Sequence, residues 1–269
     1  MIDWDDAFDN SGYIAGSDML PELWATEAAA MRSTLLAEGR GQLDQIYGPD
    51  PREIYDIFQP VGQAKGTVIF VHGGFWHLLD KSYWSHYAKG CLENGWAVAM
   101  LSYPLAPQVR ISEITAAIAR AVTHFADTSS GPFRLVGHSA GGHLVTRILC
   151  QGVLPDSVAA GISRVVSVSG MYHLAPLLET KMNDTLRLTE AEVTAESPVH
   201  LDPAGPTPIT FFVGDQERPE FLRQSRMIAE RWAAKGAQVQ TVFDQNTHHF
   251  NVIGSLQNPQ GTLTKEVLT

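Results

Sequence analysis

The stretch RLVGHSAGGHLV, Arg134–Val145, places a serine between glycines at the junction of two different patterns. A short apolar run, Phe133–Val136, stands before the serine, and an amphipathic pattern, Ala140–Gly152, follows it. The five residues GHSAG fit G-x-S-x-G, in which a strand turns sharply into a helix and lifts the serine hydroxyl to the crest of the turn. Glycines flank the serine because side chains there would collide with neighbouring backbone. The sequence therefore predicts a candidate nucleophile at Ser139.

Apolar runs and helical patterns alternate along the chain on both sides of this junction. After a predicted hairpin of Tyr47 with Glu53–Phe58, the predicted strands are Gly66–Val71, Trp96–Tyr103, Phe133–Val136, Arg164–Ser169, Ile209–Val213 and Gln238–Phe243. The predicted helices are Tyr83–Gly95, Ile111–Ala126, Ala140–Gly152 and Pro219–Gly236. The apolar runs lack strict alternation, which is typical of strands covered on both faces. The pattern predicts an α/β fold, with a mostly parallel central sheet between two helical layers.

The chain carries no linker, internal repeat or low-complexity tract, so we expect one domain over residues 1–269. Residues 1–46 carry helix signals, notably in LPELWATEAAAMRSTLLAEG, and are expected to form an N-terminal helical cover over one mouth of the sheet. Residues 171–208 form a long connection with several prolines in its second half. A connection of this length inside a compact domain predicts a lid or a binding loop.

Composition restricts the classes of partner. The net charge of −10 without a basic run argues against nucleic acid or a membrane surface, so a small-molecule substrate is expected, and a homodimer stays open. The acidic start MIDWDDAFDN lacks the basic and apolar regions of a signal peptide, and no stretch approaches the ~18 apolar residues of a membrane span, which favours the cytoplasm. Cys91 and Cys150 lie in no metal or redox spacing and are expected to be free and buried.

A serine nucleophile needs a histidine base that is itself held by a carboxylate. In the predicted architecture the chain order is serine, acid, histidine. Asp215 follows the predicted strand Ile209–Val213 and is our choice for the acid. The carboxylates ranked below it are Glu217, Asp244 and Asp202. The segment DQNTHHFNVI after the last strand offers His248 and His249, and the residues alone do not choose between them.

The segment VIFVHGGFW provides the third element of such a site. Gly73 and Gly74 follow a predicted strand, and their bare N–H groups, with that of Ala140, would form an oxyanion hole. Structural roles are expected for the histidines nearby in the sequence, His72, His138 and His143. The chain contains no G-x-x-x-x-G-K-[ST], no H-E-x-x-H and no dinucleotide-binding glycine motif, so we expect neither a metal nor a cofactor.

Taken together, these motifs resemble the α/β-hydrolase superfamily over nearly the whole chain, and more narrowly its arylformamidase (kynurenine formamidase) branch. The narrower resemblance rests on HGGFW, GHSAGGHL, SGMYHLAPL and HHFNVI, with FDNSGYI and YGPDPREIYDIF near the start. It implies His249 as the base, because the histidine of that branch directly precedes a phenylalanine, and it implies Asp215 as the acid. His173 and Asn251 stand where the branch commonly has acidic residues.

The resemblance implies a serine hydrolase that cleaves a formamide of an aromatic amine, with N-formylkynurenine in tryptophan degradation as the leading substrate. A carboxylesterase acting on small or aromatic esters is the alternative, because the same triad serves both reactions. Phe75, Trp76 and Tyr172 are the predicted pocket residues, although Phe75 and Trp76 are also suited to core packing. A binding protein with an inactive site would lack a triad member, and none is missing here.

Overall fold

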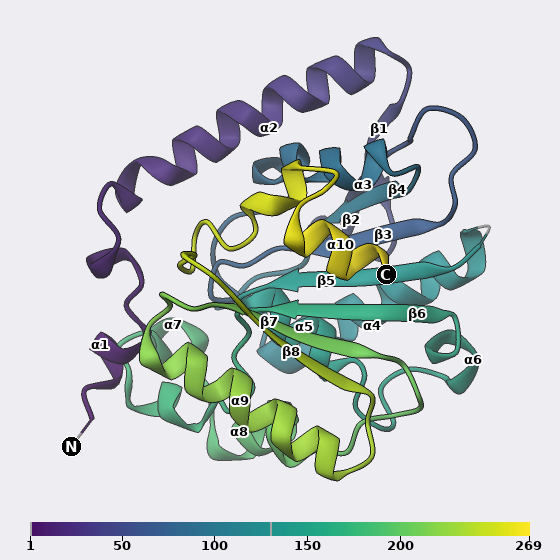
Figure 1. The fold of residues 1–269 in the computed structure, drawn as a ribbon. Helices are drawn as coiled ribbons and strands as arrows, with labels where there is room; N and C mark the ends of the chain where they lie inside the picture. The colour runs from purple at the N-terminus through teal and green to yellow at the C-terminus, as the bar shows by residue number, and fades with distance from the viewer. Residues whose placement is uncertain (1, 130) are drawn as a thin grey trace.

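An eight-stranded sheet runs through the computed structural model, which describes residues 2–129 and 131–269 (Figure 1). Met1, part of the predicted N-terminal cover, and Ser130, inside the predicted single domain, lie outside the described residues. The strands are β1 Gly41–Ile46, β2 Ile54–Phe58, β3 Thr67–Val71, β4 Ala97–Leu101, β5 Phe133–His138, β6 Ile162–Val168, β7 Ile209–Gly214 and β8 Val239–Asp244. Their order is β1-β2-β4-β3-β5-β6-β7-β8, and only the β1–β2 and β2–β4 pairs are antiparallel. The prediction of a mostly parallel sheet is confirmed.

Helices cover both faces of this sheet (Figure 1). They are α1 Trp4–Phe8, α2 Leu20–Ala37, α3 Lys89–Glu93, α4 Ile111–Thr128, α5 Ala140–Arg147, α6 Asp156–Ala159, α7 Asn183–Leu186, α8 Glu190–Glu196, α9 Pro219–Ala234 and α10 Thr262–Leu268. In β3, Val68 and Phe70 pack in the same core cluster as residues of α2, α3 and α10, whereas Ile69 and Val71 pack with residues of α4, α5 and α9. Because both faces of β3 are buried, its residues from Val68 to Val71 are all apolar.

Two predicted elements differ from the structure at their ends. Residues 41–46 form the edge strand β1 instead of part of a helical cover, and they pair with β2. The predicted helix Ala140–Gly152 ends as α5 at Arg147, because the chain beyond it pairs with the connection 202–203 through Gln151 N–H to the Asp202 carbonyl. Backbone pairing with a distant segment therefore replaces the last turn of this helix.

A third predicted element, the helix Tyr83–Gly95, also differs from the structure. It consists of a short 3₁₀ turn, Ser85–Ala88, that leads into α3. The side-chain amide of Asn94 donates to the carbonyls of both Gly90 and Pro259, which ties the end of α3 to the C-terminal segment.

The long connection 171–208 contains α7 and α8 and packs on α4. Arg110, at the start of α4, contacts Glu192 of α8, and Thr115 of α4 contacts Glu196 of α8. Its function as a lid stays a prediction.

The two cysteines are free and buried, as predicted. Within the described ranges, no helix combines the length and the apolar character that crossing a membrane requires.

Candidate active site

Ser139 occupies the sharp turn between β5 and α5, where its φ is 56° and its ψ −117°. A non-glycine residue held in such a sparsely populated region costs about 1–3 kcal/mol, so the surroundings must impose it. The Ser139 N–H donates to the Val168 carbonyl of β6 at 2.8 Å, and the His143 N–H of α5 donates to the Ser139 carbonyl at 3.0 Å. The neighbouring strand and helix therefore fix the serine at the crest.

Two glycines make this turn possible. A Cβ atom on Gly141 would lie 2.0 Å from the Val71 carbonyl oxygen of β3, and one on Gly137 would lie 2.2 Å from the Gly141 carbonyl oxygen. Both distances are far below van der Waals contact, so α5 can approach the sheet this closely only because these positions lack a side chain. The collision expected from the sequence is present at both glycines.

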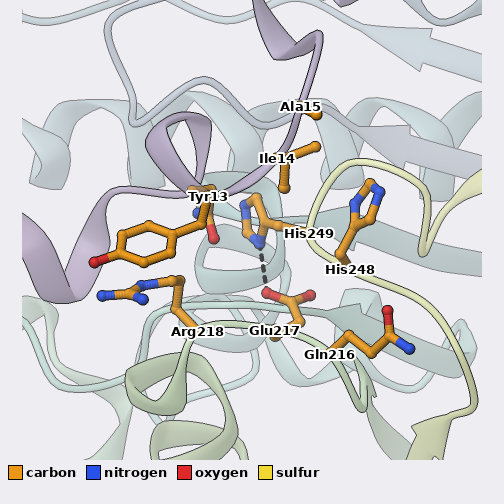
Figure 2. Close-up of a pocket in the computed structure, with 9 residues that line it drawn as sticks. Tyr13, Ile14, Ala15, Gln216, Glu217, Arg218, His248 and His249 are labelled. Atoms are coloured by element: carbon orange, nitrogen blue, oxygen red, sulfur yellow. Dashed lines mark hydrogen bonds and ion pairs between the residues drawn. The ribbon is translucent and has the colours of Figure 1, made fainter.

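His249, in the loop after β8, lies against Ser139. Its Nε2 accepts from the Ser139 hydroxyl at 3.1 Å, and only 2% of the residue is exposed. The backbone carbonyl of His249 accepts from Nε2–H of His138, at 2.9 Å, so the residue before the serine also holds the histidine loop. His248 lines a cavity instead, with its ring directed away from Glu217 (Figure 2). The structure thus brings His249, of the two candidates, to the serine.

The carboxylate that contacts His249 is Glu217. Its Oε2 accepts from Nδ1–H of His249 at 2.7 Å (Figure 2). Its other oxygen accepts from the hydroxyl of Ser169, which directly follows β6. Asp215, the acid predicted from the sequence, is exposed, and its Oδ1 accepts from the Asn246 N–H at 2.8 Å. The prediction that Asp215 holds this histidine is therefore wrong.

Backbone pairing explains this correction. The Asp215 N–H donates to the Asp244 carbonyl at 2.9 Å, so the chain at this position still continues the pairing of β7 with β8. The chain turns only afterwards, where the Glu217 N–H lies 3.4 Å from the Gly214 carbonyl. The turn buries the Glu217 side chain under the histidine and leaves the Asp215 side chain in solvent. The candidate triad is Ser139, His249 and Glu217.

The loop after β3 lies directly against the nucleophile. A Cβ atom on Gly73 would be 3.0 Å from the Ser139 Cβ atom, so a side chain there would crowd the serine. Within residues 2–129 and 131–269, the N–H groups of Gly73, Gly74 and Ala140 donate to no other protein group. Ala140 also begins α5, where the helix dipole favours negative charge. The three predicted oxyanion donors are thus unengaged, and Gly73 and Ala140 adjoin Ser139.

Two of the predicted pocket residues belong to the core. Trp76 is fully buried and its Nε1–H donates to Nδ1 of His143 at 3.3 Å. Tyr172 is also fully buried, and its hydroxyl shares a hydrogen bond of 2.8 Å with Ser167. Since their polar atoms are bonded inside the protein, neither side chain is available to a ligand, and this part of the prediction is wrong. Phe75 is half-buried and lines a cavity of about 240 Å³ with Phe8 and Phe250.

The other histidines of the region are held by hydrogen bonds inside the protein. Nδ1–H of His72 donates to the Gly73 carbonyl at 2.6 Å, and Nε2–H of His143 donates to the Glu196 carbonyl at 2.7 Å. Burial lowers the pKa of His72 and of His143 to about 4 and holds the pKa of His138 well below its usual range. These rings are neutral supports at neutral pH, as their expected structural role requires.

A second cavity, of about 330 Å³, opens beside His249 and Glu217 (Figure 2). Its other walls come from the loops after β7 and β8 and from the N-terminal segment, which supplies Asn10, Tyr13, Ile14 and Ala15. Reasoning from the sequence missed these residues and Arg218. Arg218 directly follows the acid loop, and the N-terminal FDNSGYI was noticed only as a resemblance. In the part of the chain that the structure describes, no group of three His, Cys, Asp or Glu side chains is arranged to hold a metal ion.

The comparisons with known proteins agree with this geometry. Residues 68–260 match the model of the alpha/beta hydrolase family. Kynurenine formamidase from Salmo salar is 30% identical over 254 residues, which cover 89% of this chain and 86% of the relative. The Danio rerio kynurenine formamidase is 28% identical, with coverage of 84% and 80%.

Solved structures extend the same similarity. A crystal structure from Silicibacter sp., provisionally described as a thioesterase, is 43% identical with a TM-score of 0.94 and covers all of both chains. Esterase B from Lactobacillus rhamnosis shares the fold at 19% identity, with a TM-score of 0.68 over 96% of this chain and 93% of that chain. The chain is a hydrolase that belongs to the alpha/beta hydrolase family and, within it, to the arylformamidase-like branch.

Proposed function

We propose that this hydrolase cleaves a formamide of an aromatic amine, with N-formylkynurenine as the leading substrate and kynurenine and formate as the products. The observation that carries the hydrolytic reaction is the hydrogen-bonded chain from the Ser139 hydroxyl through His249 to Glu217. The similarity to curated kynurenine formamidases over most of the chain supports the choice of a formamide.

In the first half of the proposed reaction, the Ser139 Oγ attacks the formyl carbon while its proton passes to Nε2 of His249. The carbonyl oxygen becomes an oxyanion and accepts from the N–H groups of Gly73, Gly74 and Ala140. Removal of one such donor typically costs about a hundredfold or more in rate. The preorganised backbone donors therefore stabilise charge that develops only in the transition state.

In the second half, Nε2–H of the His249 imidazolium protonates the departing aryl nitrogen as the C–N bond breaks. Ser139 is left as a formyl ester. A water molecule then attacks that ester while His249 takes its proton, and formate leaves with the serine hydroxyl restored. Glu217 stabilises the imidazolium and keeps the Nδ1 proton in place, and the Ser169 hydroxyl fixes the carboxylate.

The cavity beside the oxyanion loop favours an aromatic amine as the leaving group. Phe8, Phe75 and Phe250 line this space of about 240 Å³, which suits a flat ring. An arylamine leaves more readily than an alkylamine, so a site of the serine-esterase type can cleave this amide. The acyl side of a formamide is only a hydrogen atom, so the reaction requires no acyl pocket.

The second candidate is a carboxylesterase for small or aromatic esters. The provisionally described thioesterase at 43% identity favours it, as does an isoprenylcysteine methylesterase from Arabidopsis thaliana that is 25% identical over 80% of this chain. Both substrate classes pass through the same acyl-serine chemistry, so the triad does not discriminate between them.

Turnover of N-formylkynurenine and of p-nitrophenyl acetate by the same preparation separates the two candidates. We expect kcat/KM to be at least about tenfold higher for the formamide, which corresponds to about 1.4 kcal/mol of preferential transition-state binding. Ser139→Ala protein supplies the blank for contaminating esterases. A preference for the ester, with the formamide barely hydrolysed, would contradict the proposal.

A further inference from the structure

Two hydrogen-bond donors beside the candidate triad have no partner. Nδ2 of Asn10 and Nε of Arg218 are buried, and within the described residues neither atom forms a hydrogen bond. Both residues line the cavity of about 330 Å³ that His249 also lines, and Asn10 is 97% buried. A buried donor without an acceptor costs about 1–3 kcal/mol, so an unpaired pair in one cavity indicates an acceptor that the protein itself does not supply.

The guanidinium of Arg218 is held in place by Asp6 and Tyr13 of the N-terminal segment. Its Nη2 donates to the backbone carbonyl and to Oδ2 of Asp6, at 3.0 and 2.6 Å, and the Tyr13 ring centroid lies 3.4 Å from its Cζ. The Tyr13 hydroxyl donates to the same Asp6 carboxylate. Across residues 2–129 and 131–269, every hydrogen bond from this guanidinium to protein uses Nη2. The remaining donors are therefore oriented in advance and unoccupied.

The other charged groups of the cavity are already engaged. Both oxygens of Glu217 are occupied, one by His249 and the other by Ser169, and burial lowers the pKa of His248 so that its ring is neutral at neutral pH. Arg218 is thus the cation that this cavity offers to a ligand. The Nη2 donors are already used by Asp6, so a ligand would accept from Nε–H or from Nη1–H. A carboxylate suits these donors better than a neutral carbonyl does, because a charge-assisted hydrogen bond is the stronger one.

We propose that this cavity binds a carboxylate of the substrate, with Arg218 as the charged donor and Asn10 as the second donor. The inference rests on the proposed function, since it places the carboxylate on the amine side of the molecule whose formyl group meets Ser139. Asn10 also lines the cavity between Phe8 and Phe75, so the ring and the carboxylate would occupy adjoining spaces. The substrate class is then an aryl formamide whose ring carries a short side chain that ends in a carboxylate.

Two matched pairs of substrates test the carboxylate separately from the reaction. Ortho-formamidobenzoylpropionate, which is N-formylkynurenine without its α-ammonium group, is compared with ortho-formamidoacetophenone, which keeps the ring, the ketone and the formamide but has no carboxylate. Ortho-acetoxybenzoylpropionate is compared with ortho-acetoxyacetophenone, which repeats the contrast with an ester. The measured quantity is the ratio of kcat/KM for the anionic member to that for the neutral member.

We expect Arg218→Gln to lower this ratio about 10- to 100-fold, chiefly through KM, with the neutral members changed by less than about twofold. Asn10→Ala lowers it less, by about fivefold, because it removes a neutral donor. Arg223→Gln is the matched control, since it makes the same charge change in α9, which begins directly after Arg218, and Arg223 pairs with Glu220 outside this cavity. Asp6→Asn tests a structural role, because it removes the ion pair that holds the N-terminal segment but keeps the guanidinium.

Equal losses on charged and neutral substrates in Arg218→Gln, or an Asp6→Asn protein that loses the preference as completely, would overturn the inference. Hydrolysis of both formamides without preference for the anionic one would also overturn it, while the proposed function stands. Conversely, failure on both formamides with a preference for the anionic ester that Arg218→Gln abolishes would overturn the proposed function and leave the carboxylate site in place.

Discussion

The turn after β5 and the loop after β7 hold the two ends of one hydrogen-bonded chain, yet they are constrained in different ways. At the turn around Ser139, methyl groups on the adjoining glycines would lie about 2 Å from backbone oxygens, so the residue type is dictated by steric exclusion. In the loop, Asp215 and Glu217 are two carboxylates of similar chemistry only two positions apart. A single backbone hydrogen bond, from Asp215 N–H to the Asp244 carbonyl, decides which of them reaches the histidine.

This contrast shows which structural features can be predicted from a few neighbouring residues of the sequence. A position that excludes every side chain leaves a signature in the sequence, namely glycine. A position that needs only a carboxylate near the histidine can be filled by any of several acidic residues in the loop. The backbone conformation then decides which of them contacts the histidine.

The largest effect is expected from the nucleophile and its base. Ser139→Ala and His249→Ala should each lower kcat about 10⁴-fold or more, and the double variant should lose little beyond either single one, because the residues act as one unit. Single-turnover and steady-state rates on the preferred substrate test this, with His200→Ala, at an exposed histidine outside both cavities, as the control that stays within a few-fold of the parent. Additive losses in the double variant would show that the two residues act independently.

The next effect distinguishes the two carboxylates of the loop. Glu217→Gln should lower kcat about 10³- to 10⁴-fold, because the imidazolium loses its counter-charge and the histidine its tautomer. Asp215→Asn should change kcat by less than about twofold, since the Asp215 side chain is exposed and bonds only a backbone N–H. The reverse order of losses would restore the acid expected from the sequence.

A side chain added at the glycines of the Ser139 turn is expected to lower the stability of the protein. Gly141→Ala should lower the free energy of unfolding by about 3 kcal/mol, because the new methyl group would require α5 to move away from β3. Gly254→Ala is the matched control: a methyl group there meets no atom within 4 Å, and its effect should stay within about 0.5 kcal/mol. Urea unfolding midpoints measure both, and equal shifts would contradict the steric argument.

The smallest predicted effect concerns the buried histidines that support the turn. Burial lowers the pKa of His143 in the folded protein from 6.5 to about 4, so the unfolded chain takes up its proton first as the pH falls. Its contribution to stability is complete above pH 6.5 and is lost as the pH falls from 6.5 towards 4. Each such histidine contributes a slope of about 1.4 kcal/mol per pH unit inside that window.

Comparison of the parent protein with His143→Gln checks this dependence. The free energy of unfolding, measured by urea titration between pH 6.5 and about pH 5, should fall less steeply in the variant by about one proton. Identical slopes in the two proteins would mean that His143 titrates normally in the folded state.

Much of the sheet was predictable because buried parallel strands are short apolar runs. The predicted strand Ile209–Val213 differs from β7 by a single residue. Gly236, the last residue of the predicted helix Pro219–Gly236, has the positive φ, 84°, of a helix end. The C-terminal helix α10 was not predicted. It is short, and its position depends on long-range contacts such as Arg134 Nη1–H to the Val267 carbonyl.

The site was predictable only where a motif marks it. GHSAG and HHF lead to Ser139 and His249, whereas the sequence places Asp215 before Glu217 as the acid because it does not show where β7 stops pairing. Trp76 was expected in the pocket because aromatic residues often line ligand sites, but the sequence does not reveal its hydrogen bond to His143. No local pattern connects Arg218 with Asp6, which are 212 residues apart.

That separation has a consequence for the order of events during synthesis. The segment with Asn10 and Tyr13 leaves the ribosome first, but it meets Arg218 and His249 only after most of the chain has been made. A nascent chain arrested before His249 would therefore contain the serine turn without the cavity beside it. Contacts of such long range also close late during refolding, because their entropic cost is met only after the sheet has formed. We therefore expect activity to return after the bulk of the secondary structure.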